Sequence, residues 1–233
     1  MPPTLTMRLA ALFAPVIMLT ATPAAPATQP VPVAAKVRLT IATLHAAVLT
    51  APRAETDSVD QPYFLVSIAG PRGSASMLQL PGEGHLRIHR DEALGARPLV
   101  ELSLEPGDSV RVLVSVLVSG LSGGVHGAEE RAAADASTHA LANASSPLAD
   151  QLKTAMSPIT ATGARWLGSS ELVIANDDGT VHWRALRCLV SCSVVSGQAT
   201  AALDVANARQ QGVVELSGGG GTYHMQLRAE VAR

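Results

Sequence analysis

Residues 109–118 read SVRVLVSVLV, and this stretch decides the fold. Every second position from Val110 to Val118 is a valine, which is the period-two pattern of a β-strand. The positions between the valines hold Leu113 and Leu117 as well as polar side chains. Apolar residues on both faces predict a strand that is covered, at least partly, on both sides.

The residues before this strand predict a hairpin. Glu105-Pro106-Gly107-Asp108 has the composition of a β-turn, because proline and glycine favour the backbone angles that such turns need. Residues 99–104 have the composition of a strand. We therefore expect 99–104 and 109–118 to pair across the turn.

Further period-two stretches lie on either side of this predicted hairpin. They predict strands over 36–41, 62–68, 85–90, 171–175, 180–186, 213–216 and 222–231. Two of these flank Asn176-Asp177-Asp178-Gly179, which predicts a second hairpin in which Val181, Trp183 and Ala185 face together. Residues 222–231 show the most regular alternation in the chain.

Residues 127–160 break the β pattern, because Ala, Glu and Asp replace the β-branched residues. A first helix is expected over 128–142. Ser146 as N-cap and Pro147 as the first helical residue predict a second helix. Its apolar residues recur every fourth position, at Leu148, Leu152 and Met156. The alternative is a disordered, Ala-rich insertion.

Many short strands, hairpin turns and one helical insertion predict a mainly β fold, an antiparallel β-sandwich over residues 36–233. Hydrophobic residues make up 47% of the 233-residue chain and aromatic residues only 3%, so the core must consist of Val, Leu, Ile and Ala. The net charge of −2 provides no broad positive field for phosphate groups, which argues against a nucleic-acid partner.

The N-terminus predicts export. Arg8 lies in a short polar segment, residues 9–21 form an apolar run, and Ala25-Pro26-Ala27 offers the small residues that a signal peptidase recognises. We expect a signal peptide over 1–27, a Pro/Ala tether over 28–35, and a secreted or periplasmic location. The apolar run is shorter than the roughly 20 residues that cross a bilayer, so the mature chain should have no integral span. An uncleaved N-terminal anchor is the alternative.

The chain contains two cysteines, Cys188 and Cys192. Export to an oxidising compartment favours a disulfide between them. A disulfide requires Cα atoms within about 7 Å, whereas four residues of extended strand span about 13 Å. We therefore predict a bend over 189–191, between a strand that ends near Arg187 and one that begins near Ser193. The alternative is an unbroken strand with both thiols free.

Gly120-Leu121-Ser122-Gly123-Gly124 satisfies the G-x-S-x-G motif, in which small residues let a sharp turn expose a nucleophilic serine. Asp177 and His224 follow as a candidate acid and base. However, an α/β-hydrolase needs alternating strands and helices before the motif, and this chain supplies none there. We expect a loop without catalytic function, and a serine hydrolase that uses Ser122 is an alternative.

The order of several short motifs resembles that of C2-type β-sandwich modules. These motifs are DQPYF at 60–64, PGD at 106–108, WLG at 166–168 and GTY at 221–223. In calcium-binding modules of this class, Asp side chains from neighbouring loops converge on the metal. The resemblance assigns that role to Asp57 and Asp60. Residues 120–124 contain no acid, so we expect no metal and no other cofactor.

These observations together predict an exported, non-catalytic β-sandwich module that binds or supports an unknown protein or envelope partner. A calcium-dependent C2-like module that contacts lipid or protein is the first alternative. The serine hydrolase is the second.

Overall fold

The computed structural model describes residues 34–50, 59–71, 74–82, 86–119, 127–143, 147–177, 179–196, 201–203 and 209–232. At 127–130, 201–203, 209–210 and 232 it describes the backbone only. These residues belong to one compact unit, Pro32–Arg233. The signal peptide predicted for 1–27 lies outside the described residues, as does the predicted tether up to residue 33.

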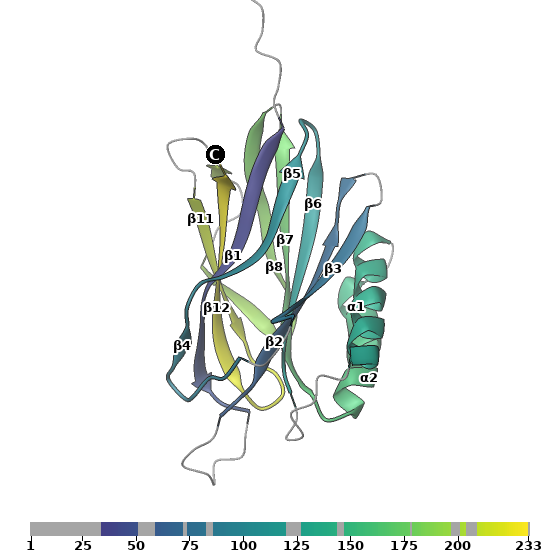
Figure 1. The fold of residues 1–233 in the computed structure, drawn as a ribbon, viewed down its shortest axis with the longest axis vertical. Helices are drawn as coiled ribbons and strands as arrows, with labels where there is room; N and C mark the ends of the chain where they lie inside the picture. Colours follow the sequence, from purple (N-terminus) through teal and green to yellow (C-terminus); the bar gives the residue numbers. More distant parts are fainter. Residues whose placement is uncertain are drawn as a thin grey trace, which may run out of the picture. The chain divides into compact units, whose positions relative to one another are not determined.

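The strands form two six-stranded antiparallel sheets that face each other (Figure 1). The first sheet has the order β4-β1-β12-β11-β9, with β5 also paired to β1, and the second has the order β10-β8-β7-β6-β2-β3. The first contains β1 (Ala35–Val48), β4 (Ala93–Leu94), β5 (Arg97–Leu104), β9 (Cys192–Ser196), β11 (Arg209–Leu216) and β12 (Thr222–Ala232). The second contains β2 (Pro62–Ala69), β3 (Ala75–Leu80), β6 (Ser109–Val118), β7 (Arg165–Asp177), β8 (Thr180–Val190) and β10 (Ala201–Leu203). The predicted antiparallel β-sandwich is confirmed.

The main core lies between the two sheets and is built from alternating residues of the long strands. The valines of β6 point into it, and Val112, Val114 and Val116 are completely buried. The apolar residues of β1 and β12 face them from the first sheet, with Leu39 and Leu227 equally buried. The alternation predicted for the first and last strands is therefore confirmed.

Two helices, α1 (Gly127–Ala142) and α2 (Leu148–Ala161), cover the other face of the second sheet (Figure 1). Leu113 and Leu117 of β6 are buried beneath them, which confirms a strand covered on both sides. On α2, Leu152 and Met156 are buried as the spacing predicts. Pro147 precedes α2 as its N-cap instead of opening it. Among the described residues, no helix is long and apolar enough to cross a membrane.

The first predicted hairpin is wrong, because β5 and β6 belong to different sheets. Both edges of β6 are occupied by β2 and β7, so β5 pairs with β1 instead. Asn176 of β7, which is completely buried, holds the connection. Its backbone N–H donates to Asp108 O (2.9 Å), its carbonyl accepts from the N–H of Gly107 (2.7 Å), and its side-chain Nδ2 donates to Leu104 O (2.8 Å).

Two further differences concern strand bounds and faces. Residues 86–90 form no strand, and only Ile88 pairs there, in a single bridge with Asp60. The second predicted hairpin, β7 with β8, is confirmed. A shift of register between Val173 and Ile174 interrupts its alternation, so Leu186 and not Ala185 follows Val181 and Trp183 into the core between the sheets.

A buried ion pair ties α1 to the second sheet. Arg111 of β6 donates from Nε to Glu171 Oε1 of β7 (2.5 Å) and from Nη1 to the carbonyl oxygen of Leu141 in α1 (2.7 Å). The Glu171 side chain is only 3% exposed, so its charge depends on this partner. The guanidinium also satisfies a carbonyl in the last turn of α1, where positive charge is favourable.

We predict that Arg111→Ala lowers the free energy of unfolding by about 3 to 5 kcal/mol, because it leaves a buried carboxylate without a partner. Arg38→Ala is the matched control, since its pair with Glu101 is half exposed and worth at most about 1 kcal/mol. Urea denaturation measures both. Equal losses in the two variants would contradict the role assigned to Arg111.

Candidate functional site

Of the residues that the sequence assigned to alternative sites, the structure describes Asp60, Asp177 and His224, while Asp57 and Ser122 lie outside the described residues. Ser119 is the last described residue before the G-x-S-x-G stretch. Its N–H donates to Gln61 O (3.0 Å) and its hydroxyl donates to Gln61 Oε1 (3.2 Å). The chain leaving β6 is therefore bound to the residue next to Asp60.

Asp60 is buried where three strands meet at one end of the sandwich. Its Oδ1 accepts from Thr50 Oγ1 (2.8 Å), and its Oδ2 accepts from Thr50 N–H (2.7 Å) and from the hydroxyl of Tyr223. Thr50 follows β1, Asp60 precedes β2, and Tyr223 is the second residue of β12. Both carboxylate oxygens thus hold protein donors, and the cluster joins the first sheet to the start of the second.

Glycines allow close packing around this cluster. A Cβ atom at Gly221 would lie 2.7 Å from Thr50 Cγ2, and one at Gly218 would lie 2.5 Å from the carbonyl oxygens of Trp166 and Leu167. Arg165 donates from Nη1 to the carbonyl of Thr50. The run of glycines at 218–221 therefore serves the turn between β11 and β12 and its contact with β7.

Burial raises the pKa of Tyr223 well above its usual value, and the hydrogen bond to Asp60 and the Asp60 charge raise it further. We predict that the contribution of Tyr223 to stability does not change with pH below about pH 10, where tyrosine in the unfolded chain begins to ionise. Above it the unfolded chain loses a proton that the folded chain keeps, so stability falls by up to about 1.4 kcal/mol per pH unit.

The measurement is urea unfolding of the wild type and of Tyr223→Phe between about pH 8 and 11. Only the difference in slope is informative, because the variant also loses a donor to Asp60. The wild type should fall more steeply above pH 10. Parallel slopes would show that Tyr223 does not keep its proton in the folded chain.

The candidate acid and base, Asp177 and His224, lie in different sheets, and each has a partner of its own. Asp177 accepts from Arg184 Nη2 (2.6 Å), which lowers the pKa of Asp177. His224 Nε2 lies 3.2 Å from Glu215 Oε2 on the outer face of the first sheet. Across the part of the chain that the structure describes, no three His, Cys, Asp or Glu side chains come together as a metal site.

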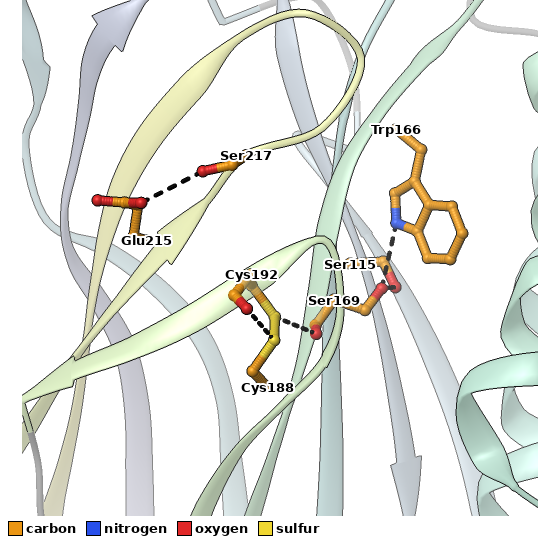
Figure 2. The surroundings of a disulfide bond; sticks show 7 residues. All are labelled: Ser115, Trp166, Ser169, Cys188, Cys192, Glu215 and Ser217. Carbon is orange, nitrogen blue, oxygen red and sulfur yellow. Dashed lines mark hydrogen bonds between the residues drawn. A yellow bond between two sulfur atoms is a disulfide. The ribbon is translucent and has the colours of Figure 1, made fainter.

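Cys188 and Cys192 are paired at disulfide distance, with their Cα atoms 5.4 Å apart (Figure 2). The strand β8 ends at Val190 and β9 begins at Cys192, so the bend is confined to Ser191, with φ of +49°. The predicted bend is therefore present, although β8 continues past Arg187. Because β8 and β9 belong to different sheets, the pair fixes a crossing of the chain between them.

Other elements hold this corner in place. Ser217 N–H donates to Ser191 O (2.7 Å), and a Cβ at Gly168 would lie 2.7 Å from the carbonyls of Val190 and Ser191. The Cys192 sulfur lies 3.0 Å from the carbonyl oxygen of Ser169 (Figure 2). A disulfide sulfur carries no proton, so this is a packing contact. The bend at Ser191 packs directly against Gly168 and leaves no room for a Cβ atom there.

We predict that Cys188 and Cys192 resist alkylation in the denatured, unreduced protein and react after reduction. Their double replacement by serine should lower the free energy of unfolding by about 2 kcal/mol, the value that loop-length scaling gives for so short a loop. Mass spectrometry after alkylation tests the pairing, and urea denaturation measures the free energy of unfolding. Two thiols that react without reductant would overturn the pairing.

A hollow on the surface of the domain lies between β3 and α1. Its volume is about 740 Å³. The β3 wall consists of Ala75, Ser76 and Met77, and the α1 wall and the residue after it contribute Asp135, Thr138, His139, Ala142 and Asn143. A volume in this range with a few polar groups is typical of binding surfaces. The sequence gives no sign of this groove, because β3 lacks clear alternation and was not predicted.

Comparisons of the chain with protein-family models, with curated proteins and with solved structures find no match. The candidate site is therefore argued from its geometry alone.

Proposed function

We propose that this chain is exported and acts as a non-catalytic β-sandwich module that binds a protein partner. The contact surface in this proposal is the groove between β3 and α1. The observation that carries the proposal is the position of this groove, which lies directly beside the open edge of a sheet. An open edge offers backbone hydrogen bonds to a partner, and the groove offers room for its side chains.

Export is supported by two independent features. The N-terminal sequence has the three parts of a signal peptide. The cysteine pair stands at the crossing between the sheets, where a disulfide would persist only in an oxidising compartment. In this proposal the mature chain is secreted or periplasmic.

The environment of the polar groups supports a module without catalysis. Asp60 has three protein donors, Asp177 is paired with Arg184, and His224 lies against Glu215. Polar groups paired in this way serve the fold, which favours a module without catalysis. The calcium-dependent C2-like module and the serine hydrolase with Ser122 stay predictions.

A photoreactive benzophenone residue in place of Ala142, which is exposed in the groove wall, tests this proposal. We predict that irradiation of the producing cells yields a protein adduct on chains whose N-terminus lies between residues 24 and 30. The same residue in place of Val195 is the control, because Val195 is 60% exposed on β9, at the edge of the other sheet. Adducts at 195 but not at 142 would contradict the assigned surface.

A further inference from the structure

The strand β3 is an edge strand without the usual protection. It ends the order of the second sheet, and within the described ranges its one strand partner is β2. Its six residues, ASMLQL, include no charged side chain and no proline. Proteins normally place charges, prolines or a covering segment at such edges, because exposed backbone groups attract other strands. The edge strand β5 has this protection, with Arg97, Pro98 and Glu101.

The helix α1 lies above the last two strands of this sheet (Figure 1). Ala133 and Ala134 of α1 pack in one cluster with Leu65 of β2, and Met77 of β3 packs against that cluster. The hydroxyl of Ser67 on β2 donates to Ala134 O (3.5 Å). The groove remains on the open side of α1, above the first half of β3.

We infer that the partner at this surface is a second copy of this chain. In this arrangement the two β3 strands pair antiparallel across a two-fold axis, and the second sheets of both copies form one continuous sheet. The axis passes through a residue of β3 and not between two residues, because only then do side chains on the same face lie opposite each other. The inference rests on the proposed function, since it identifies the protein that this surface binds.

The spacing of strands and helices supports this arrangement. Strands in a sheet lie about 4.8 Å apart. A helix that straddles β2 and β3 and its copy across the axis are therefore two strand spacings apart, or about 10 Å. Packed helices have axes 8 to 10 Å apart. The α1 helix of the second copy would thus reach the first and fill the hollow above β3.

The hydrogen-bonding side chains on the groove wall complement those of a second copy. Asp135 and His139 lie one turn apart on α1, and both are exposed in the groove. The two-fold axis makes the helices antiparallel. When it passes level with Ser137, midway between the two residues, Asp135 of each helix faces His139 of the other. A histidine N–H then donates to a carboxylate on both sides of the axis.

The test is the molar mass of the full mature chain by sedimentation equilibrium, from about 1 to 100 µM, the range that covers transient and stable dimers. The wild type should reach twice the chain mass. His139→Glu places two carboxylates opposite each other, and Asp135→Lys replaces the carboxylate acceptor by an ammonium group that faces the histidine, so each should raise the dimer dissociation constant at least about tenfold. The double variant Asp135→Lys/His139→Glu places opposite charges across the axis and should return it toward the wild-type value.

Val195→Lys is the control, because it adds a charge at another sheet edge and should leave the mass unchanged. The circular dichroism of each variant checks that it is folded. A wild type that stays monomeric at 100 µM, or a double variant as weak as the single ones, overturns the inference. An adduct at position 142 with a different protein keeps the proposed binding function and overturns only the self-pairing.

Discussion

The burial of β6 on both faces is the constraint on which the rest of the domain depends. Its valines need a cover on one side, which the first sheet supplies, and Leu113 and Leu117 need another, which the helices supply. The helical insertion is therefore a structural layer of the domain. The one charged residue in this strand, Arg111, is tolerated because Glu171 and the end of α1 satisfy it.

Two sheets made from one chain need fixed crossing points, and three of the crossings here have a link of their own. Asn176 binds the connection from β5 to β6 at one end of β6. Toward the other end, the cysteine pair closes the step from β8 to β9, and Asp60 holds the chain that passes from β1 to β2. Each link is buried or half-buried and connects residues that a sheet ladder alone would leave apart. Local polar and covalent contacts thus determine how the two sheets are connected.

The sequence predicts the long core strands well because a period of two follows directly from burial on one face, whereas β3 shows no clear alternation and was missed. It predicts their partners poorly, because the turn at 105–108 looks the same whether the next strand pairs or changes sheet. Both edges of β6 are taken by β2 and β7, and the residue that holds the changed connection, Asn176, lies about 70 residues later. The partner of Asp60 is still more distant, since Tyr223 lies 163 residues away. An isolated acid in a loop therefore suggested a calcium ligand, whereas its neighbours in space are hydroxyl and amide donors.

The edge strands of the two sheets differ in how their free backbone groups are protected. Every strand inside a sheet satisfies its backbone groups through two neighbours, so only the outer strands leave them available. Among the described edge strands, β5 carries charges and a proline, and β10 has only three residues. The strand β9 is uncharged like β3, but the helices lie on the second sheet and give β9 no second wall. Among them, only β3 combines an uncharged edge with a helix beside it. Such a surface offers backbone hydrogen bonds and side-chain contacts together, so it is suited to a folded partner that also has a helix packed on a sheet.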